Sequence, residues 1–267
     1  MAVLGASPAD HVPVGFYGER VLRVHHWSSA LFSFAISRPP GFRFRSGEFV
    51  MIGLPAPGRP LLRAYSIVSP FYADELEFLS IKVPGGAFTS RLQGIEPDDL
   101  ILLSSKPAGT LIADALRPGQ RLFLLATGTG LAPFLSVARD PDTYEKFEEI
   151  ILVHCVRYVS DLAYRETLAG LFADDCLVGE QALAQFSYLP TVTRDGFPQR
   201  ARITHMIERG ILAEGSDKEL DPVTDRVMLC GSLAMIGECR TLLERRGFAE
   251  GSANKPAEYV LERAFAG

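Results

Sequence analysis

A glycine-rich turn with the spacing of a phosphate-binding loop lies near the middle of the chain. It reads Ala126-Thr127-Gly128-Thr129-Gly130-Leu131-Ala132-Pro133, and it follows an apolar run and opens a helical pattern. Glycines let backbone N–H groups approach a diphosphate, and the N-terminus of a helix favours its negative charge. Pro133 suits the first helical turn, where its missing N–H costs nothing. The turn therefore predicts a nucleotide site.

Three arginines follow the predicted strands that come next along the chain. Arg157 follows the run 150–156, and Arg194 and Arg202 follow the run 189–192. A dinucleotide fold that prefers NAD places an acid at the end of the second strand, where it binds the ribose 2′-hydroxyl. A guanidinium group instead binds phosphate in bidentate fashion. Any one of these arginines alone would be interpreted as a surface residue, but together they favour a 2′-phosphate and hence NADP(H).

A second group of chemically suitable residues lies in the first half of the chain. Arg63 and Tyr65 are two positions apart on a predicted strand, so they share a face. A cation for a diphosphate and a flat ring for a flavin would lie side by side there, although Tyr65 is also compatible with a core position. The turn Gly85-Gly86 and the hydroxyls of Thr89 and Ser90 supply further groups for the same anion.

The elements that must position these residues differ between the two halves. Short β-rich runs separated by proline and glycine turns predict a six-stranded antiparallel β-barrel with one short helix at 89–93. The expected strands are 21–25, 31–37, 49–54, 64–68, 76–83 and 100–104. On the second of them, Phe32, Phe34 and Ile36 share a face.

After Pro118-Gly119 the pattern alternates between strand and helix. This alternation predicts a doubly wound, largely parallel α/β sheet. The expected strands are 122–126, 150–156, 189–192, 227–229 and 259–261, and the expected helices are 133–139, 162–172, 203–209 and 233–246. With the boundary near 110–117, we expect a barrel domain at residues 1–113, which carries the candidate flavin site, and an NADP(H)-binding domain at residues 114–267.

Composition restricts the class of protein. The chain has 267 residues, 27 basic and 32 acidic side chains, a net charge of −5, and 47% hydrophobic residues. This content excludes disorder as the dominant state, and the longest apolar runs fall short of the roughly 18 residues that cross a bilayer. The N-terminus lacks the basic region and apolar stretch of a signal peptide. We expect a cytoplasmic protein with neither a membrane nor a nucleic-acid partner.

Charge is unevenly distributed. Between Arg38 and Arg63 there are five arginines and one acid, Glu48. This stretch is either a solvated barrel face or a basic surface that attracts an acidic partner through its field.

The four cysteines, at 155, 176, 230 and 239, form no CxxC pair and fit no zinc or iron–sulfur spacing. We expect buried free thiols and no metal site. Any iron–sulfur partner must then be a separate protein.

Three motifs in this order resemble the ferredoxin–NADP⁺ reductase family. They are Arg63-x-Tyr65-Ser66, then Gly128-Thr129-Gly130-x-Ala132-Pro133, then Cys230-Gly231-Ser232 after a late strand. The tail 259–267, with Glu262-Arg263-Ala264-Phe265, is similar to the bacterial branch rather than the plastid branch. The resemblance covers nearly the whole chain, and the three motifs are specific only in combination.

The resemblance implies the ligand contacts. The residues implied for FAD are Arg63, Ala64, Tyr65, Ser66, Ser80, Ile81, Lys82, Phe88, Thr89 and Ser90. Those implied at the junction of flavin and nicotinamide are Thr127, Gly128, Thr129, Gly130, Cys230, Gly231, Ser232 and Met235. Those implied for the adenosine 2′-phosphate are Val156, Arg157, Thr193, Arg194 and Arg202. Plastid-type members end in a tyrosine that covers the flavin, which this chain lacks. We expect Ala264 to take the position against the ring and Phe265 to lie beside it.

The resemblance also implies an activity. Tightly bound FAD would exchange electrons between NADP(H), as hydride, and a one-electron carrier, ferredoxin or flavodoxin. Ser66 and Cys230 would lie beside the reacting flavin N5 and nicotinamide C4, as positioning groups rather than nucleophiles. Two alternatives remain at this point: the reductase component of an oxygenase system, and a non-catalytic flavin-binding subunit or sensor. A monomer is the default state.

Overall fold

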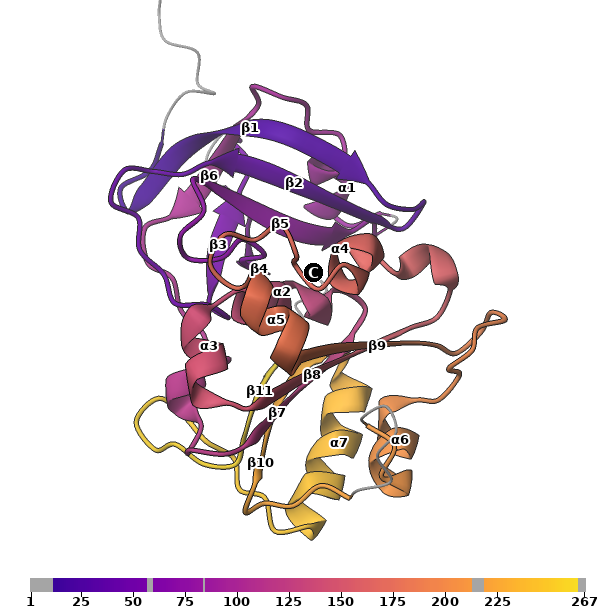
Figure 1. Cartoon of the computed structure of the whole chain (residues 1–267). Coiled ribbons are helices and arrows are strands. Elements are labelled where there is room, and N and C mark those ends of the chain that lie inside the picture. Colours follow the sequence, from indigo (N-terminus) through magenta and orange to yellow (C-terminus); the bar gives the residue numbers. More distant parts are fainter. Residues whose placement is uncertain (1–11, 57–59, 84, 213–218, 264–267) are drawn as a thin grey trace, which may run out of the picture.

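Two sheets, one from each half of the chain, form the framework of the protein (Figure 1). The structure is a computed structural model that describes residues 12–56, 60–83, 85–212 and 219–263. In Figure 1 the N-terminal half, in indigo and magenta, lies above the C-terminal half, in orange and yellow. This division into a barrel and a parallel sheet confirms the predicted fold class.

The N-terminal sheet is antiparallel, with strand order β4-β3-β6-β1-β2-β5. Its elements are β1 (Phe16–His26), β2 (Leu31–Ser37), β3 (Phe49–Gly53), β4 (Leu62–Ser66), β5 (Glu75–Ile81), α1 (Thr89–Leu92) and β6 (Leu100–Ser104). An antiparallel bridge between Ile67 and Phe78 joins the two edges and closes the barrel. Phe32, Phe34 and Ile36 of β2 all pack into its interior, as their alternation predicts. The opposite face of β2 is also covered, because Leu31 packs against the second domain.

The C-terminal sheet is parallel, with order β11-β10-β7-β8-β9. Its strands are β7 (Arg121–Thr127), β8 (Glu149–Val156), β9 (Phe186–Val192), β10 (Asp225–Gly231) and β11 (Tyr259–Arg263). The helices and 3₁₀ turns are η2 (Ala113–Ala115), η3 (Gly128–Leu131), α2 (Ala132–Val137), α3 (Pro141–Lys146), η4 (Val159–Asp161), α4 (Arg165–Ala169), α5 (Gly179–Gln185), α6 (Ile203–Arg209) and α7 (Leu233–Arg245). Helices α6 and α7 cover one face, while α2, α4 and α5 pack against the other.

The helix predicted over 162–172 is wrong in extent, because only α4 is helical there. Tyr164 precedes α4 with a φ of 58°, and Leu171 and Phe172 follow it with φ of 50° and 55°. Left-handed backbone at both ends interrupts the helix. Tertiary contacts hold Tyr164 in place, since its hydroxyl donates to Glu77 of the barrel at 2.8 Å.

Helices α3 and α5 were not predicted. The start of α3 carries a recognisable signal, because Asp140 accepts a hydrogen bond from the Asp142 N–H at 3.0 Å and Pro141 occupies the first turn. An N-cap followed by proline is thus the sequence signal by which α3 was detectable.

Contacts across the junction fix the two sheets relative to each other. The ring of Tyr164 lies 4.6 Å from that of Trp27 on the β1–β2 hairpin. Farther along the junction, Asp175 accepts from the Tyr72 hydroxyl at 2.6 Å and from Arg139 Nε at 2.9 Å. Aromatic packing and charge-assisted hydrogen bonds thus hold the barrel against the α/β domain, and a cleft between them has a defined shape.

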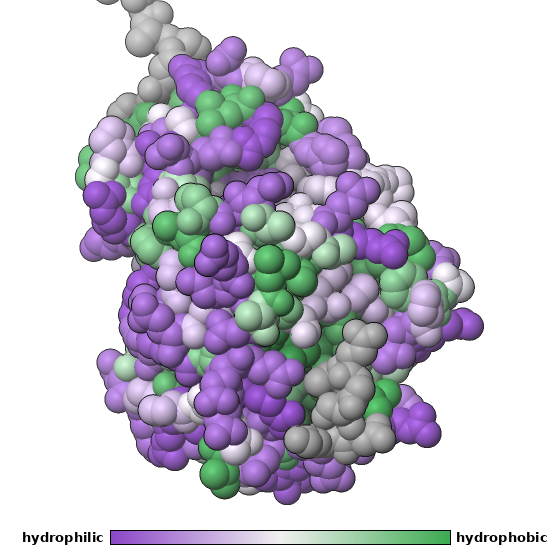
Figure 2. Space-filling view, viewed as in Figure 1, coloured by the Kyte–Doolittle hydropathy of each residue, from purple (hydrophilic) through white to green (hydrophobic). Residues whose placement is uncertain are grey.

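The four cysteines are free thiols, and three of them are buried. Cys176 is exposed, so the expectation of burial is wrong for this residue, which lies in the turn before α5. Within the described ranges, no helix has the length and apolarity needed to cross a membrane. On the face shown in Figure 2, hydrophobic residues form small separate areas among hydrophilic ones.

Asp225 provides a test of how β7 and β10 are held together. Its carboxylate is fully buried and accepts from Arg121 Nε and Nη2, both at 2.7 Å, and from the Asp221 N–H. Asp225→Ala leaves the guanidinium without its partner, so the free energy of unfolding should fall by about 3–5 kcal/mol in denaturant titrations.

The control for this substitution is Lys146→Ala, which breaks an exposed ion pair with Asp114. It should cost less than about 1 kcal/mol, because solvent screens the pair. Equal losses for the two variants would contradict the structural role of Asp225.

Candidate functional site

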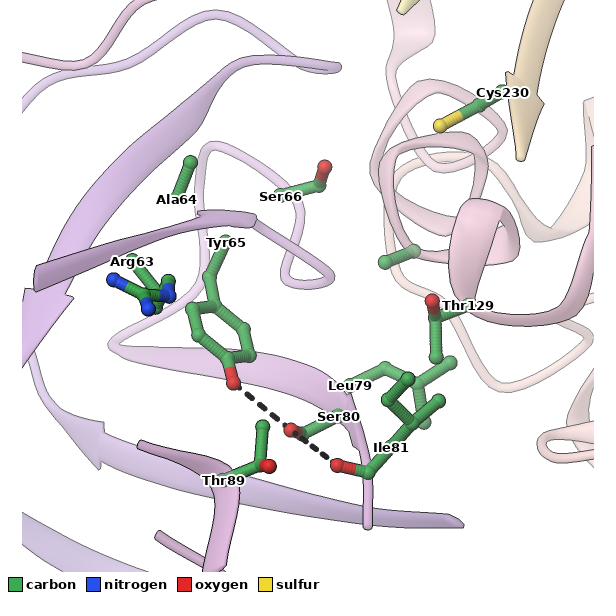
Figure 3. A pocket seen from close by; sticks show the side chains of 11 residues that line it. Arg63, Ala64, Tyr65, Ser66, Leu79, Ser80, Ile81, Thr89, Thr129 and Cys230 are labelled. Carbon is green, nitrogen blue, oxygen red and sulfur yellow. Dashed lines mark hydrogen bonds between the residues drawn. The ribbon is translucent and has the colours of Figure 1, made fainter. Parts of the chain in front are cut away.

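Residues of both domains line one cleft (Figure 3). The residues that line it are Arg63, Ala64, Tyr65, Ser66, Leu79, Ser80, Ile81, Thr89, Thr129, Ala132 and Cys230. Strands β4 and β5 and helix α1 provide the barrel wall, while η3, α2 and the end of β10 provide the other. The two main motifs of the sequence therefore meet across the domain junction.

Arg63 and Tyr65 lie side by side on β4, as their spacing predicts (Figure 3). Arg63 donates from Nη1 to its neighbour's backbone carbonyl, but its Nε is buried and has no hydrogen-bond partner among the described residues. A buried unpaired donor is costly unless a ligand satisfies it. This nitrogen is therefore suited to an anion bound at the cleft.

Tyr65 is held rigidly by its surroundings. Its hydroxyl lies 2.9 Å from Ser80 Oγ, and its ring contacts those of Phe34, Phe78 and Phe88. Burial raises the pKa of Tyr65 to about 12, so the ring remains a neutral phenol. Ser66 follows at the end of β4, and in Figure 3 its side chain extends toward the wall that carries Thr129 and Cys230.

The opposite wall depends on a close approach of two turns. A Cβ on Gly130 would lie 2.2 Å from the backbone carbonyl oxygen of Cys230, so only glycine fits there. Thr127 Oγ1 accepts from the Ser232 N–H at 3.0 Å, and Ser232 Oγ accepts from the Met235 N–H at the start of α7. The turn after β7 and the start of α7 therefore form one unit.

Cys230 is buried at the end of β10, with its side chain pointing into the cleft (Figure 3). Burial raises the pKa of the Cys230 thiol well above its ordinary value, and the Glu262 carboxylate adds to this shift. The thiol thus stays protonated at neutral pH and is a poor nucleophile. This state is consistent with a positioning role.

Glu262 is a residue of this region that the sequence analysis did not single out as a candidate. It pairs with Cys230 in the register of β10 and β11, and its Oε2 accepts from the Thr110 N–H at 3.2 Å. Its other oxygen, Oε1, is buried without a partner among the described residues. Burial raises the pKa of Glu262 to about 7, with Glu48 adding a smaller effect and the Thr110 hydrogen bond opposing it. The sequence did contain a signal for this residue, because Glu262 is an acid that directly follows the apolar residues of β11.

The three arginines predicted for a phosphate are exposed near the ends of β8 and β9 and at the start of α6. The Arg194 N–H donates to the Arg157 carbonyl at 2.9 Å, and the Thr193 N–H donates to the Val156 carbonyl at 3.0 Å, so these two segments lie together. Arg202 immediately precedes α6. Among the described residues, no acidic side chain forms an ion pair with Arg157, Arg194 or Arg202.

Other predicted site residues have different surroundings. Lys82 donates from Nζ to the Ser28 carbonyl at 3.1 Å, Phe88 is buried in the barrel core, and Ser90 bonds the Gly86 carbonyl. These three lie outside the lining of the cleft. Ala264 and Phe265 lie outside the described residues. The described part of the chain also contains no cluster of three His, Cys, Asp or Glu side chains arranged to hold a metal ion.

Comparisons with known proteins give consistent results. Residues 23–111 match the oxidoreductase FAD-binding domain, and residues 124–241 match the oxidoreductase NAD-binding domain. The chain is 50% identical over 254 residues to ferredoxin–NADP reductase A of Sorangium cellulosum, covering 95% of this chain and 91% of that protein. It is 49% identical over 263 residues to the flavodoxin/ferredoxin–NADP reductase of Rhodobacter capsulatus, covering 98% and 96%.

A solved structure agrees with these relatives. The ferredoxin NADP⁺ reductase of Neisseria gonorrhoeae, with bound FAD and NADP, superposes with a TM-score of 0.86 at 29% identity. The match covers 95% of this chain and 100% of that one. Similarity therefore extends over both domains and the cleft between them.

The raised pKa of Glu262 predicts a pH-dependent stability. Between the ordinary glutamate pKa and about 7, the folded chain binds the proton that the unfolded chain has lost, so stability decreases as pH rises through this window. Glu262→Gln removes the group that must lose a proton in the folded chain. The free energy of unfolding of the variant, relative to that of wild type, should therefore increase by about 2 kcal/mol between pH 5 and pH 8.

Denaturant unfolding at the two pH values measures this difference. Glu208→Gln, an exposed position on α6, is the matched control and should track wild type. Parallel pH profiles for Glu262→Gln and wild type would contradict the raised pKa.

Proposed function

Because the chain belongs to the ferredoxin–NADP reductase family, we propose that the cleft between its sheets holds FAD against β4 and receives the nicotinamide at the turn after β7. The protein is an FAD-dependent oxidoreductase that exchanges electrons between NADP(H) and ferredoxin. One observation carries the site assignment: Arg63–Ser66 and the Thr129–Cys230 wall face each other across a single cleft.

The residues present fit a flavin dinucleotide. The unsatisfied Nε of Arg63 is suited to a pyrophosphate oxygen, and the rigid ring of Tyr65 is suited to packing on the isoalloxazine. Ala64, Leu79 and Ile81 supply apolar lining between the polar groups. Bound FAD supplies the conversion between two-electron hydride transfer and one-electron transfer.

The residues present also fit NADP(H) rather than NAD(H). Arg157 and Arg194 are exposed and lie on segments joined by a backbone hydrogen bond. Within the described residues neither forms an ion pair with a carboxylate, and Asp161 acts on Arg157 only through its longer-range field. Arg202 adds a third positive charge at the start of α6. Guanidinium groups whose donors are not taken up by a contacting carboxylate are suited to the 2′-phosphate of the adenosine.

The cleft side chains orient the reactants and control protons. Ser66 and Cys230 approach from opposite walls, and Cys230 remains a neutral thiol, so both act by position and polarity. Glu262, next to Cys230 on the neighbouring strand, has a pKa raised to about 7, so its carboxyl group holds a proton below this pH and titrates near it. Removal of water from this buried region strengthens each of these interactions.

Further assignments extend the proposal. The domain boundary at 113/114 lies between the two matched domain families, which end at 111 and begin at 124. The name of the Rhodobacter relative supports flavodoxin as a second carrier. We further assign the protein to the cytoplasm, as a monomer.

Reduction of ferricyanide by NADPH, using purified protein that retains FAD, tests the function and the 2′-phosphate site together. Wild type should be active, and Arg157→Ala should weaken NADPH binding by about 1.5–3 kcal/mol, or roughly 10- to 150-fold in KM. KM for NADH should change little, because NADH lacks the phosphate.

Arg209→Ala, an exposed arginine on α6, is the control for lost surface charge and should leave both KM values unchanged. Equal losses for NADPH and NADH in Arg157→Ala would refute the phosphate assignment. Colourless protein that rejects FAD would refute the function itself.

The basic stretch Arg38–Arg63 predicts salt-sensitive encounter with ferredoxin. Arg45 forms an ion pair with Glu48 at 3.0 Å. Arg38 donates to three backbone carbonyls, and the Asp74 carboxylate is its electrostatic partner. Arg43 is exposed. Ferredoxin reduction should slow as salt rises, and Arg43→Gln should lower the low-salt rate and flatten the dependence.

Ferricyanide reduction by the same Arg43→Gln protein should be unchanged, and Arg209→Gln should retain the wild-type salt dependence. A wild-type rate that does not vary with salt would show that this stretch is an ordinary surface.

A further inference from the structure

His154 is a buried titratable residue that none of the assignments above uses. It lies on β8 with 1% of its surface exposed. In the sheet, β8 lies between β7, which leads into the glycine-rich turn, and β9, which leads into the segment of Arg194. Its Nε2 lies 3.2 Å from the carbonyl oxygen of Gly128, and its Nδ1 lies 3.5 Å from the Tyr188 hydroxyl on β9. The imidazole thus connects the turn to the sheet behind it.

The contact with Gly128 fixes the proton position on the ring. A carbonyl oxygen only accepts hydrogen bonds, so Nε2 must carry the proton and donate it. Nδ1 is then an acceptor, which suits the longer contact from the Tyr188 O–H. Burial lowers the pKa of His154 to about 4, so the imidazole is neutral at physiological pH and keeps this one tautomer.

The hydrogen bond acts on a backbone that is otherwise permissive. Gly128 has a φ of +55°, and a Cβ there would meet no atom within 4 Å. Two things hold its conformation: the backbone hydrogen bonds of η3, of which it is the first residue, and the contact of its carbonyl with His154. In a planar trans peptide the C=O of one residue and the N–H of the next point in opposite directions. A Gly128 carbonyl held inward by His154 thus directs the Thr129 N–H away from the imidazole.

We infer that His154 is a positioning residue for the pyridine dinucleotide: by holding the Gly128 carbonyl, it sets the orientation of the Thr129 peptide in the wall of the cleft. The inference rests on the proposed function, since it concerns how the turn receives NADP(H). His154 itself is buried and is not among the residues that line the cleft. It acts through the backbone of the turn, whereas Arg157 binds the other end of the same molecule.

Binding of NADP⁺ to the FAD-loaded protein, followed by flavin difference spectra, tests this role. His154→Leu keeps an apolar side chain of similar bulk but lacks the donor, and it should raise the Kd by about 5- to 10-fold. His154→Gln places an amide N–H near the position of Nε2 and should restore the Kd to within about twofold of wild type. Tyr188→Phe removes only the longer contact and should have a smaller effect than His154→Leu.

Adenosine 2′-monophosphate distinguishes an effect at the glycine-rich turn from an effect at the arginine site, because this ligand carries neither pyrophosphate nor nicotinamide. Its Kd, measured by calorimetry, should be the same for wild type and His154→Leu. Weakened binding of this ligand in His154→Leu, or a Gln variant as impaired as the Leu variant, would show that His154 only maintains the fold, and would overturn the inference.

The protonation state of the His154 ring can be measured directly by NMR. Long-range ¹H–¹⁵N correlation spectra of the histidine-labelled holoenzyme should show His154 protonated at Nε2 and unchanged between pH 6 and pH 8. Protonation at Nδ1 would overturn the inference. If wild type failed to bind NADP⁺ at all, the proposed function would fail; wild-type affinity in His154→Leu would overturn the inference alone.

Discussion

The structure depends on the close packing of two turns at the carboxyl ends of adjacent parallel strands. The turn after β7 and the turn after β10 approach so closely that Gly130 has no space for a Cβ beside the Cys230 carbonyl. Parallel strands end at the same edge, so residues separated by a hundred positions meet there. The buried pair of Arg121 and Asp225 at the opposite ends of these strands holds them in register. A cleft wall built in this way is rigid without direct help from a ligand.

Burial gives the cleft its chemical character. Cys230, Glu262 and Tyr65 all have raised pKa values because water is excluded around them. Two of them are thus neutral at physiological pH, and Glu262 titrates near it. Positive charge is supplied by Arg63, beside Tyr65 on the barrel wall of the cleft, and by Arg157 at the exposed end of β8. These guanidinium groups are suited to holding phosphates, while the neutral groups suit the region where electrons are transferred.

The sequence was most informative where one local rule sufficed. The alternation of apolar and polar residues predicted barrel strands such as β2, and the glycine spacing predicted the turn after β7. The two-residue spacing of Arg63 and Tyr65 placed both on one face of β4, as observed. Prediction failed where a distant contact overrode local preference. The helix expected over 162–172 is interrupted because Tyr164 packs against Trp27 and Glu77 of the other domain. No local pattern contains that contact.

By itself, then, the sequence determined the two architectures and the residue types available for an anion, a flat ring and a 2′-phosphate, because these depend on periodicity and composition over short windows. Only the tertiary structure decided which residues share an environment. It brought Glu262 beside Cys230, turned Lys82 toward the hairpin, and placed His154 behind the glycine-rich turn. Such neighbours are set by strand order and domain packing, which involve residues far apart in the chain.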